Sequence, residues 1–140
     1  MIEEKLVQVK VEADCWQDAI RVSCGKLLEL DMITSSYIES IFANIERYGM
    51  YFILLDKLAL PHSSTFEEVR ETGLAITTLK NPIDMKGKQV QVLMTLASTS
   101  HTSHLGMLQE LSEVLQRDNI VNKLIQCNAS EEIVKIMEER

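Results

Sequence analysis

The chain has 140 residues, of which 46% are hydrophobic and 25% are charged, so it can bury a core without staples and is not disordered. Its formal net charge is −7, and no cluster of Lys or Arg offsets this, which excludes a general binder of nucleic-acid backbones. We expect one domain over residues 1–140.

The N-terminal segment MIEEKLVQVKVEADCW has acidic residues and no long apolar run. It therefore predicts neither a signal peptide nor a membrane anchor, and we expect a cytoplasmic protein. Cys15, Cys24 and Cys127 lack a CxxC spacing, and an odd number of cysteines fits a reducing compartment, where they would be buried hydrophobic residues. No paired-ligand motif supports a zinc site that would combine them with the three histidines, so no metal or cofactor is expected.

The first part of the chain predicts a strand and two helices. Alternating apolar residues from Leu6 to Val11 are typical of a strand. Apolar residues then recur every three or four positions from Trp16 to Leu30, which predicts a helix that Asp14 could cap. Thr34 or Ser35 can serve as the N-cap of a second helix, and Gly49 can end it in the left-handed αL conformation.

The middle of the chain predicts four further extended segments. Two short ones, 52–55 and 58–60, are separated by a turn or bulge at residues 56–57, and Pro61 ends the pairing because it has no N–H. Residues 73–79 and 90–97 form the other two. Between them lie two turn-favouring sequences, Asn81-Pro82 and Lys86-Gly87-Lys88.

The last third predicts three helices. Ser103 can cap one that runs to Leu115, Asp118 can start a short one that runs to Ile125, and Ser130 opens the last. The order of elements fits an α/β fold, a three-layer α/β/α sandwich around a mixed sheet of four to five strands.

Searches for motifs exclude several chemistries. The sequence has no GxxxxGK[ST], GxGxxG or GxSxG motif, so it indicates neither a nucleotide site nor a hydrolase.

The histidines remain as candidate site residues. His62 follows the segment 58–60, and His104 follows the segment 90–97 within the first turn of the helix expected from Ser103. Because sites in open α/β sheets lie beyond strand ends, the two imidazoles could converge where a helix N-terminus favours a phosphoryl group.

An ordinary structural interpretation of each residue stays open on this evidence alone. A histidine at a strand end is commonly a solvent-exposed polar residue, and Arg47 near a helix C-terminus is a favourable partner of the helix dipole. Ser63 and Ser64 are typical turn formers.

Longer motifs resemble a known family. ALPHSS and VRETGLAITTLKNPID, with IERYGMYFILLDKLALPH before and VQVLMTLASTSHTSHLGMLQELSEVL after them, are similar to enzyme IIA components of the bacterial sugar phosphotransferase system. The resemblance is to the fructose and mannitol superfamily, closest to its ascorbate-type branch. Two serines follow the PH dipeptide, where related proteins often carry a basic residue.

The resemblance implies a mechanism. His62 would take a phosphoryl group from the phosphocarrier protein HPr and pass it to a cysteine of the cognate IIB component, which serves a membrane IIC component. His104 would donate a hydrogen bond to the phosphoryl group, Arg47 would add positive charge, and the backbone N–H groups of Ser63 and Ser64 would complete the oxygen cradle. A small apolar rim should exclude water from the N–P bond.

Three points remain open. His101 rivals His104 as the second histidine, and we favour His104 because LGMLQEL after it matches the family's helix, whereas His101 would fall in the approach loop. Two other functions remain, a regulatory module controlled by phosphorylation of His62 and a non-catalytic binding domain. The sugar and the oligomeric state cannot be predicted from the sequence.

Overall fold

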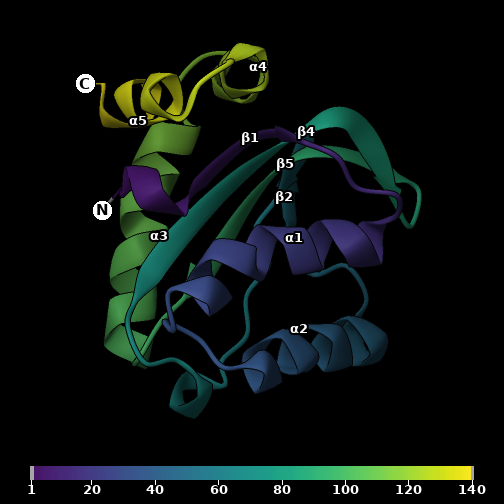
Figure 1. Ribbon diagram of the computed structural model, residues 1–140, viewed down its shortest axis with the longest axis vertical. Helices are drawn as coiled ribbons and strands as arrows, with labels where there is room; N and C mark the ends of the chain where they lie inside the picture. Colours follow the sequence, from purple (N-terminus) through teal and green to yellow (C-terminus); the bar gives the residue numbers. More distant parts are fainter. Residues whose placement is uncertain (1, 140) are drawn as a thin grey trace.

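Five strands and five α-helices make up the part of the chain that the computed structural model describes, residues 2–139 (Figure 1). The elements in chain order are η1 Glu4–Leu6, β1 Val7–Val11, α1 Trp16–Glu29, α2 Ser35–Tyr48, β2 Ile53–Leu55, β3 Lys57–Ala59, η2 Phe66–Glu68, β4 Gly73–Met85, β5 Lys88–Ala97, α3 His101–Leu115, α4 Ile120–Gln126 and α5 Ser130–Glu138.

The strands form one mixed sheet in the order β1-β4-β5-β3-β2. β1 pairs parallel with β4 and β3 parallel with β5, whereas β4–β5 and β2–β3 are antiparallel. The long connection from β1 to β4, which includes α1 and α2, permits this parallel pairing. The predicted mixed sheet is confirmed, with five strands.

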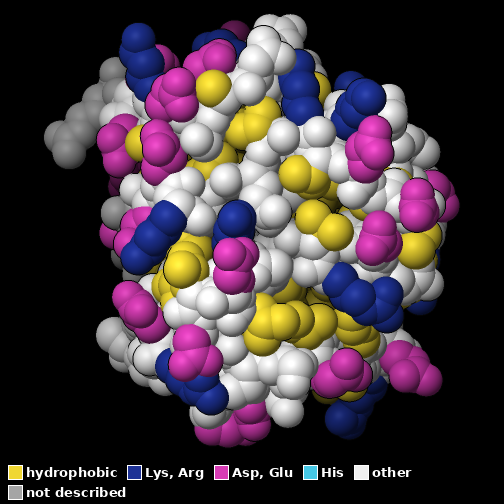
Figure 2. Space-filling view, in the orientation of Figure 1, with side chains coloured by type: hydrophobic (Ala, Val, Ile, Leu, Met, Phe, Trp, Pro, Cys, Tyr) yellow, Lys and Arg dark blue, Asp and Glu magenta, His cyan; other side chains and the backbone are white. Residues whose placement is uncertain are grey.

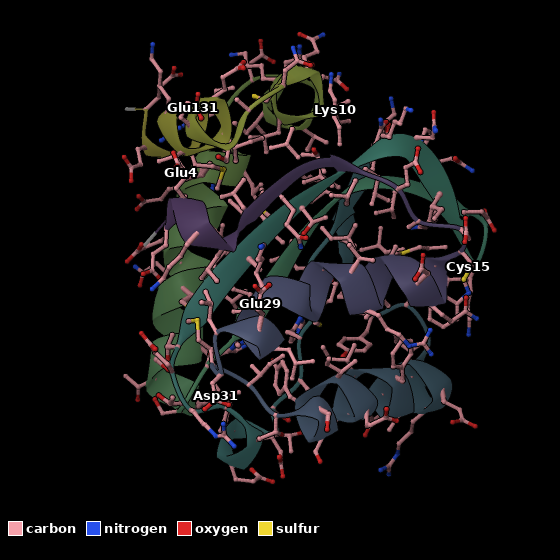
Figure 3. The ribbon with its side chains drawn as sticks, in the orientation of Figure 1. Glu4, Lys10, Cys15, Glu29, Asp31 and Glu131 are labelled. Carbon is pink, nitrogen blue, oxygen red and sulfur yellow. The ribbon has the colours of Figure 1, made fainter. Side chains whose placement is uncertain are left out.

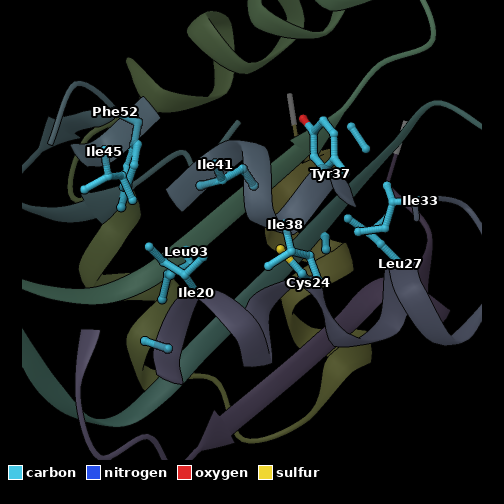
Figure 4. Packing of buried hydrophobic residues seen from close by; sticks show 14 of the residues in the cluster. Ile20, Cys24, Leu27, Ile33, Tyr37, Ile38, Ile41, Ile45, Phe52 and Leu93 are labelled. Carbon is cyan, nitrogen blue, oxygen red and sulfur yellow. The ribbon is translucent and has the colours of Figure 1, made fainter. Parts of the chain in front are cut away.

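Helices cover both faces of the sheet. Alternation along β4 sends Leu74 and Ile76 into a cluster with α3, α4 and α5, and sends Ala75 and Leu79 into a second cluster with α1 and α2. Figure 1 shows α1 and α2 on one side of the strands and α3 to α5 on the other, and Figure 4 shows the packing of the α1 and α2 side. The three-layer α/β/α arrangement is therefore confirmed.

Charged side chains lie around the outside of these layers. Glu4 and Glu131 lie near the outline of the molecule in Figure 3, and Glu29 and Asp31 are exposed at the end of α1. Figure 2 shows acidic and basic side chains intermixed on this face with hydrophobic ones between them. Cys24 and Cys127 are buried as expected, but Cys15 is exposed. No helix within residues 2–139 combines the length and hydrophobicity needed to cross a bilayer.

Two predicted helix caps are wrong because a neighbouring residue takes the place. α1 has Cys15 rather than Asp14 at its N-cap, and the Asp14 N–H instead donates to the Asp18 carboxylate. α4 follows Asn119, whose φ of 59° turns the chain into the helix one residue later than Asp118 predicts. Such one-residue shifts are within the normal range for helix ends.

The start of α3 lies earlier than predicted. Its N-cap is Ser100, not Ser103, and the Ser100 hydroxyl accepts the Ser103 N–H at 3.1 Å. The Ser103 hydroxyl lies 3.3 Å from the Ser100 N–H and closes a reciprocal capping box. As a result, His101 is the first residue of the helix and not part of an approach loop.

The second helix agrees more closely with its prediction. Thr34 is the N-cap of α2, although its hydroxyl accepts no N–H from the helix and instead donates to the Glu68 carboxylate. Gly49 ends α2 with the expected positive φ of 79°, but its ψ of −161° lies outside the αL region. A residue with a Cβ would be strained there.

The predicted turn at Asn81-Pro82 is wrong, because β4 continues through both residues to Met85. Pro82 cannot donate to the ladder, and the pairing with β5 shifts register between Thr78 and Ile83 to accommodate it. The hairpin turn comes at Lys86-Gly87, whose φ angles of 51° and 97° suit a tight two-residue connection.

Candidate active site

Two neighbouring strands end at the same edge of the sheet and bring the predicted histidines together. β3 and β5 run parallel, and the Leu96 N–H donates to the Pro61 carbonyl at 3.0 Å, which continues their alignment beyond the end of β3. The imidazole rings of His62 and His104 lie with their centroids 5.3 Å apart. The prediction that strand ends would converge here is confirmed.

One ring nitrogen of His62 is occupied by the backbone. Its Nδ1 lies 2.7 Å from the Leu60 carbonyl oxygen. A carbonyl oxygen can only accept, so Nδ1 carries the proton, and the lone pair of the neutral ring lies on Nε2. The half-buried His62 side chain is thus fixed in the tautomer whose outer nitrogen is nucleophilic.

Two tyrosines hold the backbone around His62. The Tyr51 hydroxyl donates to the His62 carbonyl, and the Tyr51 ring stands edge-on to the imidazole with a centroid separation of 5.3 Å. The Tyr37 hydroxyl accepts the Ser63 N–H at 3.1 Å and donates to the Leu96 carbonyl at 2.6 Å. Burial raises the pKa of both phenols, so both stay neutral hydrogen-bonding groups.

His104 is the second imidazole of the site. It is half-buried on the first turn of α3, and its Nδ1 lies 3.5 Å from the buried Ser98 hydroxyl. Burial lowers the pKa of His104, and the nearby His62 and His101 lower it further. His104 is therefore neutral near pH 7 and keeps one N–H to donate.

His101 also belongs to this region. It is exposed on α3, and its ring centroid lies 6.4 Å from that of Phe66, while His104 lies 6.3 Å from the same ring. His101 and His104 are three residues apart and so lie on one side of the helix. The helix therefore presents both histidines, not one, to the cavity.

An open cavity of about 470 Å³ surrounds the imidazoles. Its lining comprises Asn44, Tyr48, Tyr51, His62, Ser63, Ser64, Phe66, His101 and His104. The three aromatic side chains agree with the predicted apolar rim. Neither an acidic residue nor a lysine or arginine is among these nine, and within residues 2–139 no group of three or more His, Cys, Asp or Glu side chains could hold a metal ion.

The remaining predicted residues differ in their access to the cavity. Ser64 is exposed and lines it. Ser63 is buried, and its N–H already donates to Tyr37, so it fixes the loop more directly than it could bind an added group. Arg47 is exposed outside the lining, with its guanidinium 5.3 Å from the Tyr48 ring centroid.

The sequence analysis did not predict several residues of the site. Asn44 reaches the Ser63 hydroxyl at 3.4 Å, and Tyr48 lines the cavity with 63% of its surface exposed. The spacing of Tyr37, Asn44 and Tyr48 by seven and four residues places them along one stripe of α2, a signal that was available. The contact of Tyr51 with His62 had no such signal.

The fold and the site define an α/β sandwich in which two histidines meet where parallel strands end. Over residues 1–140 the chain matches the family described as "Phosphoenolpyruvate-dependent sugar phosphotransferase system, EIIA 2", and it belongs to that family. The chain is therefore a sugar phosphotransferase component and takes part in phosphoryl transfer.

Relatives and solved structures agree with this assignment. The ascorbate-specific EIIA component of Shigella boydii serotype 4 is 29% identical over 99% of this chain and 92% of its own length. The crystal structure of a putative IIA protein, PtxA, from Streptococcus mutans superposes with a TM-score of 0.91 at 28% identity, covering 97% of this chain and 88% of that one. The Escherichia coli mannitol IIA in a complex with phosphorylated IIB shares the fold, with a TM-score of 0.82 at 15% identity over 100% of this chain and 99% of that one.

Proposed function

We propose that this chain is a phosphocarrier that accepts a phosphoryl group from phospho-HPr on His62 and passes it to a cysteine of the cognate IIB component. The hydrogen bond between His62 Nδ1 and the Leu60 carbonyl is the observation that carries the proposal. Because this bond uses Nδ1, the nitrogen left for attack on phosphorus is Nε2.

The transfer balances without a further reactant. The Nε2 lone pair forms a bond to phosphorus while the donor's N–P bond breaks and its electron pair returns to the donor nitrogen. The proton stays on Nδ1, which donates it in a hydrogen bond to the Leu60 carbonyl, so the ring is cationic while it holds the group. A cationic ring leaves readily when the IIB thiolate attacks phosphorus in the second transfer.

Four residues assist His62 in this proposal. His104 donates an N–H to the phosphoryl oxygens, and the exposed Ser64 offers its backbone N–H. Arg47 acts from outside the cavity through its long side chain, and Ser63 keeps the loop in place. The aromatic rim limits access of water to the N–P bond.

The proposed partners follow from the comparisons and from the surface. A IIB protein binds the E. coli mannitol IIA, which supports a IIB component as the acceptor here, and the ascorbate-specific relatives make an ascorbate-type IIB the first to test. Tyr48 lines the cavity and is 63% exposed, and Leu105, next to His104 in the chain, is 52% exposed. Each offers an apolar contact that HPr and IIB would use in turn. From this cytoplasmic chain the phosphoryl group would pass to the IIB component and then to the sugar, together with a membrane IIC component.

Phosphorylation with phosphoenolpyruvate, enzyme I and HPr tests the proposal. We expect one acid-labile phosphoryl group, with a ³¹P chemical shift of Nε2-phosphohistidine, that is absent from His62→Gln. His104→Gln should slow transfer about 10- to 100-fold, as for loss of a hydrogen bond to a charged group. An unlabelled His62 contradicts the proposal, and loss of transfer in His101→Ala but not in His104→Ala contradicts the choice of His104.

The second transfer separates the carrier from the regulatory alternative. Phosphorylated chain mixed with an ascorbate-type IIB should lose its label to the IIB cysteine, and a Cys→Ser IIB is the matched control. A chain that accepts the group but gives it to no IIB component would favour the regulatory module.

A further inference from the structure

The cavity lacks a permanent positive charge. Among its nine lining residues the titratable groups are His62, His101, His104, Tyr48 and Tyr51. A phosphoryl group bound to His62 would bring two negative charges into a cavity where, besides the acceptor ring itself, the only lining residues that can become cations are His101 and His104.

Charged groups on the neighbouring elements lie outside this lining. On η2, behind Phe66, Glu67 is exposed and Glu68 accepts a hydrogen bond from Thr34. On α2, Arg47 lies against the Tyr48 ring. On α3 the nearest acidic residue, Glu110, is six residues beyond His104 and lines a different cavity.

His101 is placed to act with His104. Both rings pack near Phe66, both line the cavity, and His104 lies 5.3 Å from the acceptor ring. His101 is exposed at the start of α3, so solvent reaches its ring.

We propose that His101 is a further residue of the phosphoryl-transfer site, and that with His104 it balances the phosphoryl charge by taking up protons when the group arrives on His62. This inference rests on the proposed function. It makes the phosphorylation equilibrium more favourable at mildly acidic pH, because the phosphorylated form binds more protons than the free form.

Electrostatics gives the size of the effect. A dianion about 5 Å from an imidazolium in water stabilises the cation enough to raise its pKa by about one unit. His104 should show this shift, and the more exposed His101 should show a smaller one. In the free protein the pKa of His104 is lowered by burial and by its neighbours, so proton uptake accompanies phosphorylation instead of preceding it.

The first test follows the imidazoles directly by NMR. The Cε1–H and ring ¹⁵N signals of His101 and His104 are titrated in the free protein and in protein kept phosphorylated by phosphoenolpyruvate, enzyme I and HPr. We expect the pKa of His104 to rise by about one unit and that of His101 by about half a unit on phosphorylation. An unchanged titration midpoint for His101 overturns its role.

The second test uses the equilibrium with phospho-HPr between about pH 6 and pH 8. Each variant's equilibrium constant is divided by the wild-type value at the same pH, which cancels the titration of HPr. His101→Gln should lose about threefold at pH 6 and nothing at pH 8, whereas His101→Lys, a permanent cation, should match wild type at pH 6 and exceed it at pH 8.

Lys88→Gln is the matched control, because it removes an exposed cation at the other end of β5, about 30 Å along the strand. It should follow wild type at every pH. If His62 is never phosphorylated, the proposed function fails. If His62 is phosphorylated and His101→Gln follows wild type at both pH values, only this inference fails.

Discussion

Removing the Tyr37 hydroxyl should weaken both the fold and the site. This hydroxyl joins the Ser63 N–H, next to His62, to the Leu96 carbonyl of β5. Ser63 is 2% exposed and Leu96 is 0% exposed, so water cannot replace the lost partner. Figure 4 shows the Tyr37 ring among the buried residues that α2 packs against the sheet.

The magnitude follows from the two groups left behind. Tyr37→Phe keeps the ring but leaves a buried N–H without this acceptor, at about 1–3 kcal/mol, and removes one of the hydrogen bonds that Leu96 accepts. We expect a loss of about 2–3 kcal/mol in the free energy of unfolding. For a domain of this size the midpoint of thermal unfolding should fall by about 6–10 °C.

Urea unfolding followed by far-UV circular dichroism measures the loss. Tyr48→Phe is the matched control, because Tyr48 lies on the same helix and is 63% exposed, and it should change stability by less than about 0.5 kcal/mol. At a temperature where the Tyr37→Phe protein is folded, phosphorylation of His62 should also be several-fold slower. Equal stabilities of the two variants would refute this account of how residues 62 and 63 are held.

Three further outcomes can be checked together. Gly73→Ala should destabilise the fold by about 1–3 kcal/mol in urea unfolding, because a Cβ there would lie 2.5 Å from the Met32 Cε, and no loss would mean that this methionine moves aside freely. Iodoacetamide at pH 8 should label the exposed Cys15 first in peptide mapping and leave Cys24 unlabelled while the protein is folded, since burial raises the pKa of the Cys24 thiol to about 12. Because the pKa of His104 is lowered in the folded protein, the unfolded chain binds more protons than the folded one below about pH 6.5. The protein should therefore lose stability as the pH falls below that value, and a His104→Gln protein should lose less over the same range.

The sequence predicted the layers and the meeting of the histidines because both depend on short-range patterns. Period-two alternation from Leu6 to Val11 and helical periodicity from Trp16 to Leu30 are local signals of a strand and of a helix. His62 and His104 each follow a predicted strand, and sites in open α/β sheets lie beyond strand ends. These two facts together predict that the two histidines meet.

The contacts that hold His62 could not be predicted in this way. Tyr37 and Leu96 are 59 residues apart in the chain, and nothing local to either residue indicates the other. The choice between Ser100 and Ser103 as the cap of α3 had a similar limit, because each serine can bond to the other's backbone and the sequence STSHTSH does not order them. The turn predicted at Asn81-Pro82 was wrong for the opposite reason. The local sequence favoured a turn, but β4 pairs with β5 on both sides of Pro82 and continues through it.

The hydrogen-bond partner of the His62 ring affects how well the ring could accept and release the phosphoryl group of the proposed function. A carboxylate at Nδ1 would orient the ring equally well, but its full negative charge would raise the pKa of the imidazole and protonate Nε2. It would also repel the incoming phosphoryl group. The neutral Leu60 carbonyl fixes the same tautomer without either effect. No Asp or Glu is among the residues that line the cavity, so none of them adds a negative charge there. In the proposed function, His104 and His101 stabilise the phosphorylated form together with Arg47 and Ser64. The charge of the two histidines can be adjusted by proton uptake, which would suit a carrier that holds the group only until its acceptor docks.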